Sequence, residues 1–403
     1  MHAIRILQHC LSAALEEVHA KRCGVLLKAV ESAATGAPLT MTELARNWPG
    51  AEFSHLPLKS VDRLLSNRQL WSEMAGLRQS MYPWLIRTQR PLLLVDWAKL
   101  KPDGDWALLR AAVPAGGRAL SVAEMIFPIS RMGQPAAQIE FLGVLKRALP
   151  PEVCPILVTD AGFRSDWYRA VEAHGWHFIG RLRNTTQVQT TATPDWQPCR
   201  SLHTLARDSC RDLGPCRIVK GNPMDSRLVL APKRDRRLPS GRTGNGTTAK
   251  KARKRAAEPW LLTTSLGQQD FNATQVVGLY AKRMQIEASF RDLKSRNYGA
   301  GFESSLTRSQ KRLEVLLLIH ALATFAAWLL SLVVERLDLP DPMSRQHSHR
   351  HRYSSIRRAR EWLRRRWSPA FTAAIRYLLG SPPSTWPPLD VDDGQIHQIC
   401  GET

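Results

Sequence analysis

The chain has 403 residues, of which 43% are hydrophobic, so it can fill the cores of two or three domains and is not disordered throughout. Its 57 Lys and Arg against 35 Asp and Glu give a formal net charge of +22, well beyond what solubility requires. Such a charge predicts a polyanionic partner, above all nucleic acid, although it names no activity.

Residues 1–85 show helical periodicity and predict a helical DNA-binding domain. The segment Thr40-Met41-Thr42-Glu43 is typical of a helix start, and a further helix is expected over residues 58–71. Arg63 and Arg68 lie on the polar side of that helix. The pattern predicts helix-turn-helix-like DNA contact, and a small bundle with a solvated face fits it equally well.

Residues 86–184 predict the first part of an α/β core. Two short apolar runs, Pro91–Trp97 and Ile156–Gly162, have the pattern of buried central strands, and each carries an acid near its end, Asp96 and Asp160. The expected order is three strands, a helix, a strand, a helix and a strand, at residues 91–97, 106–113, 117–128, 135–148, 156–162, 165–174 and 176–182.

Residues 185–259 are polar and broken by Pro and Gly, which predicts a β-rich insertion with short strands such as 226–231. Within it, residues 233–256 carry ten Lys or Arg against Asp235 alone. We expect a mobile basic loop there, with a solvated linker as the alternative.

Residues 260–303 are expected to complete the core with a strand at 260–265 and one long helix over 273–295. Residues 304–403 form a helical C-terminal region with a second basic block, Arg345–Arg366. The uncharged run Val315–Val334 has the length of a membrane span, but polar residues interrupt it and nothing else looks lipid-facing. We therefore predict no membrane partner, and a buried helix or one that pairs two copies near residues 312–337.

The seven cysteines are odd in number and have no paired spacing, which favours a reducing cytosol. A zinc site from Cys199, His203, Cys210 and Cys216 is not favoured, because known zinc modules use closely spaced ligand pairs. The N-terminus has no continuous apolar signal region. These features predict a cytoplasmic protein.

Asp96 and Asp160 are the first candidates for chemistry. An acid directly after an apolar run lies at the rim of a sheet or within it, where an unpaired charge costs several kcal/mol unless a metal or a partner neutralises it. Mg²⁺ prefers oxygen ligands, and two such ions about 3.5–4 Å apart can activate the attacking oxygen and stabilise the leaving oxygen of a phosphodiester. Mn²⁺ can substitute.

The helix over 273–295 supplies the third acid. Tyr280, Arg283, Glu287 and Lys294 lie at offsets 0, 3, 7 and 14, which at about 100° per residue form one stripe of about 60°. A Glu between Arg and Lys on one stripe presents a metal ligand among cations suited to phosphate. A surface helix with chance polar spacing remains the alternative.

The stripe resembles the signature of the bacterial insertion-sequence transposases of the Asp-Asp-Glu type: Tyr, two residues, Arg, three residues, Glu, six residues, Lys. All four positions match, and the contexts Leu94-Val95-Asp96-Trp97 and Asp160-Ala161-Gly162-Phe163 are also similar. The resemblance implies an α/β, multi-domain protein with a ribonuclease H-like mixed-sheet catalytic core, a β-rich insertion and helical flanks. It implies that Asp96, Asp160 and Glu287 are the catalytic metal ligands.

The resemblance also implies cut-and-paste DNA transposition through 3′ nicking, a hairpin intermediate and strand transfer, by a homodimer on the element's terminal inverted repeats. Tyr280, Arg283 and Lys294 would contact DNA near the cleaved phosphate. Trp260 is similar in place to a base-stacking Trp of the family, although its distance from Glu287 differs by one residue, and a core Trp at a strand start fits as well.

Three other functions were considered. A structure-specific nuclease or resolvase would use the same fold and ions, and only strand-transfer products separate it from a transposase. If the chain were a non-catalytic DNA-binding protein, the placement of the two Asp residues and the stripe with Glu287 would be a coincidence. A tyrosine recombinase, suggested by His347-Ser348-His349-Arg350 and Tyr353, is discarded because its nucleophile would follow the His and Arg too closely.

Overall fold

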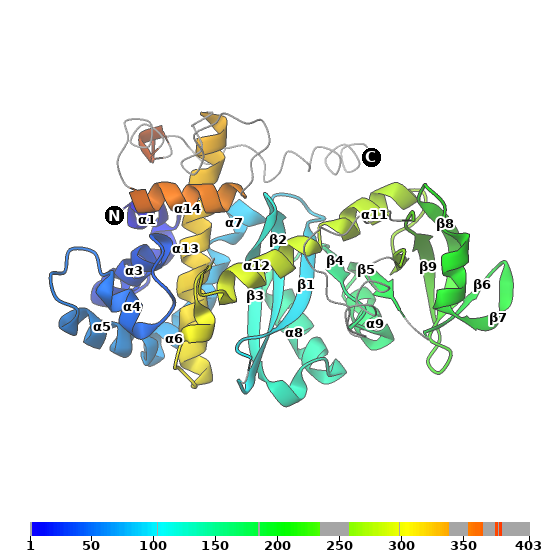
Figure 1. Cartoon of the computed structure of the whole chain (residues 1–403), viewed down its shortest axis with the longest axis horizontal. Coiled ribbons are helices and arrows are strands. Elements are labelled where there is room, and N and C mark those ends of the chain that lie inside the picture. Colours follow the sequence, from blue (N-terminus) through cyan, green and yellow to red (C-terminus); the bar gives the residue numbers. More distant parts are fainter. Residues whose placement is uncertain are drawn as a thin grey trace, which may run out of the picture.

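The computed structural model describes residues 2–102, 104–183, 186–233, 258–297, 299–337, 354–365, 375–377 and 379–380. One sheet of ten strands runs through these parts of the chain, with helices at one end and across its faces (Figure 1). The predicted basic loop at 233–256, apart from its first residue, lies outside the described residues, as do His347–Tyr353.

The first five strands form a mixed sheet in the order β3-β2-β1-β4-β5. β1 pairs antiparallel with β2 and parallel with β4, β2 pairs antiparallel with β3, and β4 pairs parallel with β5. This is the ribonuclease H-like arrangement, so the expected α/β fold class is confirmed. The elements are β1 (Leu92–Lys99), β2 (Trp106–Ala115), β3 (Arg118–Pro128), α8 (Pro135–Ala148), β4 (Ile156–Thr159), α9 (Ser165–Ala173) and β5 (His177–Leu182).

The β-rich insertion continues this sheet. β10 pairs antiparallel with both β5 and β9, and the order then runs β9-β8-β6-β7. β10 therefore belongs to the core and also joins it to the insertion, whose strands extend to one end of the molecule in Figure 1. These strands are β6 (Gln187–Thr190), β7 (Thr193–Pro198), β8 (Arg211–Ile218), β9 (Met224–Leu230) and β10 (Leu261–Thr264).

The N-terminal region is helical, as expected, but the helix predicted over residues 58–71 is two helices. α5 ends at Leu65, and the Asn67 side chain accepts a hydrogen bond of 2.9 Å from the Leu70 N–H, which begins α6. Arg63 and Arg68, both exposed, therefore lie on different helices. The helices are α1 (His2–Cys10), α2 (Ser12–Glu16), α3 (Ala20–Ala34), α4 (Met41–Arg46), α5 (His55–Leu65), α6 (Arg68–Gln79) and α7 (Tyr82–Leu85).

The single long helix expected over 273–295 is also two helices, α11 (Ala273–Ala281) and α12 (Met284–Lys294). Between them the backbone makes bonds of the i to i−3 type, from Lys282 N to Leu279 O and from Arg283 N to Tyr280 O. This tighter winding breaks the α-helical pattern without any Gly or Pro at the joint. Figure 1 shows α12 and α11 crossing the sheet as one bent line.

α13 (Gln310–Arg336) packs between the N-terminal helices and β3, and α14 (Ser355–Arg365) lies across it. α13 is the one helix among the described residues that is long and apolar enough to span a membrane, yet 94% of its most apolar window is buried inside the protein. It is therefore a core helix. The expectation that residues near 312–337 pair two copies stays a prediction.

Three short 3₁₀ helices complete the described secondary structure, at Ile129–Arg131, Cys199–Leu205 and Phe302–Ser304.

A buried ion cluster ties the N-terminal helices to the sheet. Glu124 on β3 forms ion pairs with Arg110 on β2 at 2.5 Å and with Arg78 on α6 at 2.7 Å, and its side chain is 3% exposed. Burial would raise the pKa of Glu124, but the two guanidinium groups outweigh this effect and hold the pKa below its usual value.

We expect Glu124→Gln to lower the free energy of unfolding by about 3 kcal/mol, because it leaves two buried guanidinium groups without a full counter-charge. Denaturant titration measures the change. Glu140→Gln breaks the exposed Arg131–Glu140 pair and should cost no more than about 0.5 kcal/mol. Equal effects of the two substitutions would contradict this account.

His320 on α13 gives the fold an acid-sensitive point. Burial lowers the pKa of His320 to about 3, and the nearby charges of Arg360, Arg110 and Arg78 act in the same direction, whereas Glu124 opposes them. The neutral imidazole is favoured in the fold, so its contribution to stability is complete above pH 6.5 and is lost as the pH falls from 6.5 towards 3.

Between pH 6 and 4, the free energy of unfolding of wild type should fall by up to about 1.4 kcal/mol per pH unit more than that of His320→Gln. Unfolding curves across that range test this, and parallel pH profiles would refute it.

Candidate active site

Asp96 and Asp160 occupy equivalent positions on neighbouring parallel strands. β1 and β4 pair with Leu92 opposite Ile156 and Leu94 opposite Val158, an offset of 64 residues that leads from Asp96 to Asp160. Asp96 lies within β1, and Asp160 directly follows β4, so both acids come to the same edge of the sheet.

The turn after β4 orients Asp160. The Gly162 N–H donates to Asp160 Oδ1 at 2.7 Å, which holds the carboxylate against its own backbone. A Cβ atom at position 162 would lie 2.9 Å from that oxygen, closer than side chains normally approach. Gly162 is thus required for this position of the carboxylate.

Arg283 connects Asp96 with Glu287. It lies at the joint between α11 and α12, and its guanidinium is 2.5 Å from Glu287 Oε1 and 3.5 Å from Asp96 Oδ2. The Asp96 side chain is 14% exposed, whereas that of Glu287 is 42% exposed. The structure therefore brings together three of the predicted residues, Asp96 from β1 and Arg283 and Glu287 from the joined helices α11 and α12.

The acids act on one another electrostatically. Burial, followed by the charge of Asp160, raises the pKa of Asp96 to about 7, while Arg283 opposes the rise and Glu287 adds to it. Within the described parts of the chain, no three His, Cys, Asp or Glu side chains are gathered closely enough to hold a metal ion as they stand. Arg283 provides the positive charge next to Asp96 and Glu287.

Tyr280 and Trp260 pack together beneath this site. Their ring centroids are 4.8 Å apart at 72°, an edge-to-face contact, and the side chains are 1% and 7% exposed. Tyr280 lies on α11 and Glu287 on α12, so the predicted single-helix stripe does not continue through the joint. Trp260 has the position of a core residue before β10, and the prediction that it stacks on a base is not tested by this packing.

Lys294 is the last residue of α12 and lies two turns beyond Glu287, on the same face of that helix. Arg63 and Arg68 belong to α5 and α6, which lie at the other side of α13 from β1 in Figure 1. The structure brings Lys294 to the helix that carries Glu287, and it leaves the two N-terminal arginines away from the acids.

Arg181 is a residue that sequence reasoning missed. It lies in β5 and is 7% exposed, and its Nε has no hydrogen-bond partner among the described residues. Burial, then the charge of Arg183, lowers the pKa of Arg181 to about 10, and Tyr280 acts against this shift. Its position in the otherwise apolar run Phe178-Ile-Gly-Arg181-Leu could have indicated a buried cation from the sequence.

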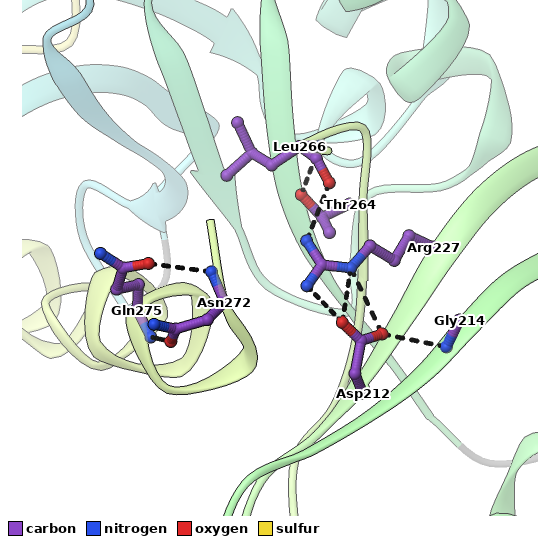
Figure 2. A network of polar contacts seen from close by, with 7 residues as sticks. All are labelled: Asp212, Gly214, Arg227, Thr264, Leu266, Asn272 and Gln275. Carbon is purple, nitrogen blue, oxygen red and sulfur yellow. Dashed lines mark hydrogen bonds and ion pairs between the residues drawn. The ribbon is translucent and has the colours of Figure 1, made fainter. Parts of the chain in front are cut away.

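A polar network fixes where α11 begins. Arg227 on β9 pairs with Asp212 on β8 at 2.5 Å and donates to the Leu266 carbonyl at 3.0 Å, which anchors the segment after β10 (Figure 2). Asn272 and Gln275 form a reciprocal capping box at the start of α11. These contacts connect the insertion with the helix pair that carries Arg283 and Glu287.

Tyr280→Phe should change the free energy of unfolding by less than about 0.5 kcal/mol, because it keeps the edge-to-face packing on Trp260. Tyr280→Ala removes that packing and should cost about 3–5 kcal/mol. Denaturant titration of both variants checks this. A large loss of stability in Tyr280→Phe would show that the hydroxyl, and not the ring, holds the site together.

Part of the chain is similar to known proteins. The family model of the transposase DDE domain matches residues 137–326, which include Asp160 and Glu287 but not Asp96. No curated protein matches the chain. Among solved structures, the chain is similar to the piggyBac transposase in a synaptic complex with hairpin DNA, with 12% identity and a TM-score of 0.44 over 98% of this chain and 82% of that chain. Residues 137–326 are thus similar to a transposase DDE domain.

Proposed function

We propose that the protein is a DNA transposase of the insertion-sequence type, which moves its element by cut-and-paste transposition. The observation that carries the proposal is the register of β1 and β4, because it sets Asp96 beside Asp160 at one edge of the sheet, where Arg283 joins Asp96 to Glu287. The match to a transposase DDE domain agrees with it. The Tyr-Arg-Glu-Lys signature and the particular likeness to the transposase of the tetracycline-resistance transposon remain predictions from the sequence.

The donor set fits divalent metal ions. Asp96, Asp160 and Glu287 offer only carboxylate oxygens, and the pKa of Asp96 is raised partly because Asp160 lies close to it, so a cation would relieve the repulsion. We propose that these acids hold two Mg²⁺ ions, which Mn²⁺ can replace. When bound, the ions would activate the attacking oxygen and stabilise the leaving oxygen of the phosphodiester.

The surrounding side chains have separate roles in this proposal. Arg283 and Lys294, at the two ends of α12, would bind phosphate oxygens near the cleaved bond, because guanidinium and ammonium groups are the side-chain cations that bind phosphate. Tyr280 would hold Arg283 in place; the Arg283 guanidinium lies 5.9 Å from the centre of the Tyr280 ring. Trp260 would stack on an unpaired base only if the ring moves out of its present packing.

The reaction would begin with hydrolysis that nicks one strand at each transposon end. The freed 3′-hydroxyl would attack the opposite strand to give a hairpin, water would reopen the hairpin, and the same hydroxyl would attack target DNA. The DNA partners would be the terminal inverted repeats and the target, and two copies of the chain would pair the ends. Arg63 and Arg68 would bind DNA outside the active site, in the nucleoid of a bacterial cytoplasm.

A structure-specific nuclease with the same ions is the second candidate, and a non-catalytic DNA-binding protein is the third. Cleavage and joining of a DNA fragment that carries the element's own ends separates the three. A nuclease would nick without joining, and a binding protein would show no metal-dependent chemistry.

With Mg²⁺, Asp160→Asn, Asp96→Asn and Glu287→Gln should each lower hairpin formation and strand transfer by roughly 10³-fold or more, because each removes a metal ligand. Gel analysis of labelled DNA ends measures both products, and EDTA should abolish them. Asp195→Asn, an exposed acid on β7, is the matched control and should keep full activity. Undiminished joining by Asp160→Asn would refute the assignment.

A further inference from the structure

A cavity with both polar and apolar lining residues lies on the side of the core away from the insertion, where the helices α12, α13 and α14 meet strands β2 and β3. Its volume is about 50 Å³, which is room for a few water molecules or one small ion. None of its lining residues is among those proposed for catalysis. The polar ones are Arg110, Arg118, Ser121, Ser289, Asp292, His320, Thr324, Arg357 and Arg360.

Positive charge exceeds negative charge around this cavity. Four arginines line it, whereas Asp292 is its one lining carboxylate among the described residues, and Asp292 pairs with Arg118. Arg110 shares the carboxylate of Glu124 with Arg78 behind the cavity wall. Two carboxylates, Asp292 and Glu124, thus serve Arg118, Arg110 and Arg78.

Arg360 brings a further cation to the cavity from the C-terminal basic block. Arg360 Nη2 donates a hydrogen bond to a neutral group, the Ala33 carbonyl, at 3.2 Å. Burial, opposed by Asp292 and aided by Arg357, lowers the pKa of Arg360. His320, which also lines the cavity, is neutral in the fold and adds no further positive charge. A guanidinium in such surroundings is stabilised by an anion.

Two hydroxyl groups add neutral donors to the same cavity. Ser121 Oγ and Thr324 Oγ1 are buried and have no hydrogen-bond partner among the described residues. Buried hydroxyls are normally hydrogen-bonded, and a hydroxyl beside guanidinium groups can donate to an anion that the guanidinium groups bind.

We propose that this cavity binds a single tetrahedral oxyanion of the phosphate type, held by Arg360, the neighbouring arginines and the Thr324 hydroxyl. Planar guanidinium groups bind such oxygens in pairs, which favours an oxyanion over a spherical halide. The ligand is either free inorganic phosphate or a phosphate of the DNA backbone. In both cases the anion joins α14 to α12 and α13, so it holds the C-terminal basic helix on the core.

Thermal unfolding of the full chain tests the proposal in a buffer without phosphate or sulfate. Inorganic phosphate is titrated at constant ionic strength, with chloride as the reference salt. A ligand at about 100 times its Kd should raise the Tm by about 3 °C for a chain of this length. Arg360→Gln removes the charge and Thr324→Val removes the hydroxyl with little change in shape. Arg364→Gln is the control, because Arg364 lies on the same helix with a side chain 71% exposed.

We expect a saturable rise in Tm for wild type and Arg364→Gln that is lost in Arg360→Gln and reduced in Thr324→Val. If phosphate has no effect but a short DNA duplex gives this same pattern, the oxyanion belongs to the DNA backbone. If all variants respond equally to phosphate and to DNA, the binding is general charge attraction and the proposal is wrong. Should Arg360→Gln fail to fold, Thr324→Val against Arg364→Gln decides the question.

Discussion

The parallel pairing of β1 with β4 is the constraint on which the site depends. A parallel ladder fixes which residues lie side by side, and here it sets Asp96 beside Asp160 at one edge of the sheet. A slip of one residue would turn one acid to the opposite face. The buried leucines and valines of both strands prevent such a slip, so the register that packs the core also positions the chemistry.

Much of this arrangement could be predicted from local sequence. Apolar runs that end in an acid located β1 and β4, and α8 begins and ends where its pattern predicts, at Pro135 and Ala148. These elements were accessible because burial on both faces of a central strand leaves an uninterrupted apolar run. An apolar run could not show that β10 joins the core strands to those of the insertion, since strand order depends on pairings between distant segments.

The helix joint at Lys282 and Arg283 could not be predicted for a different reason. The sequence there contains neither Gly nor Pro, and a periodicity argument assumes that a helix continues until such a signal ends it. The helix breaks where a few backbone hydrogen bonds change to the i to i−3 type, at Arg283, which pairs with Asp96 and Glu287. Tyr280 packs into the core against Trp260, whereas the spacing of Tyr280, Arg283, Glu287 and Lys294 predicted one stripe on a single helix.

The two polar clusters beside α12 have opposite charge imbalances. At one end of the helix, the Arg283 guanidinium pairs with Asp96 and Glu287, and the charge of Asp160 acts on Asp96. Near its other end, four arginines line a cavity with one carboxylate, Asp292. Buried charge of one sign is costly, so each cluster favours a ligand of the opposite sign. The acids favour cations, which phosphodiester chemistry requires, and the arginines favour an oxyanion. The same helix can therefore join a metal-dependent site to a contact with phosphate.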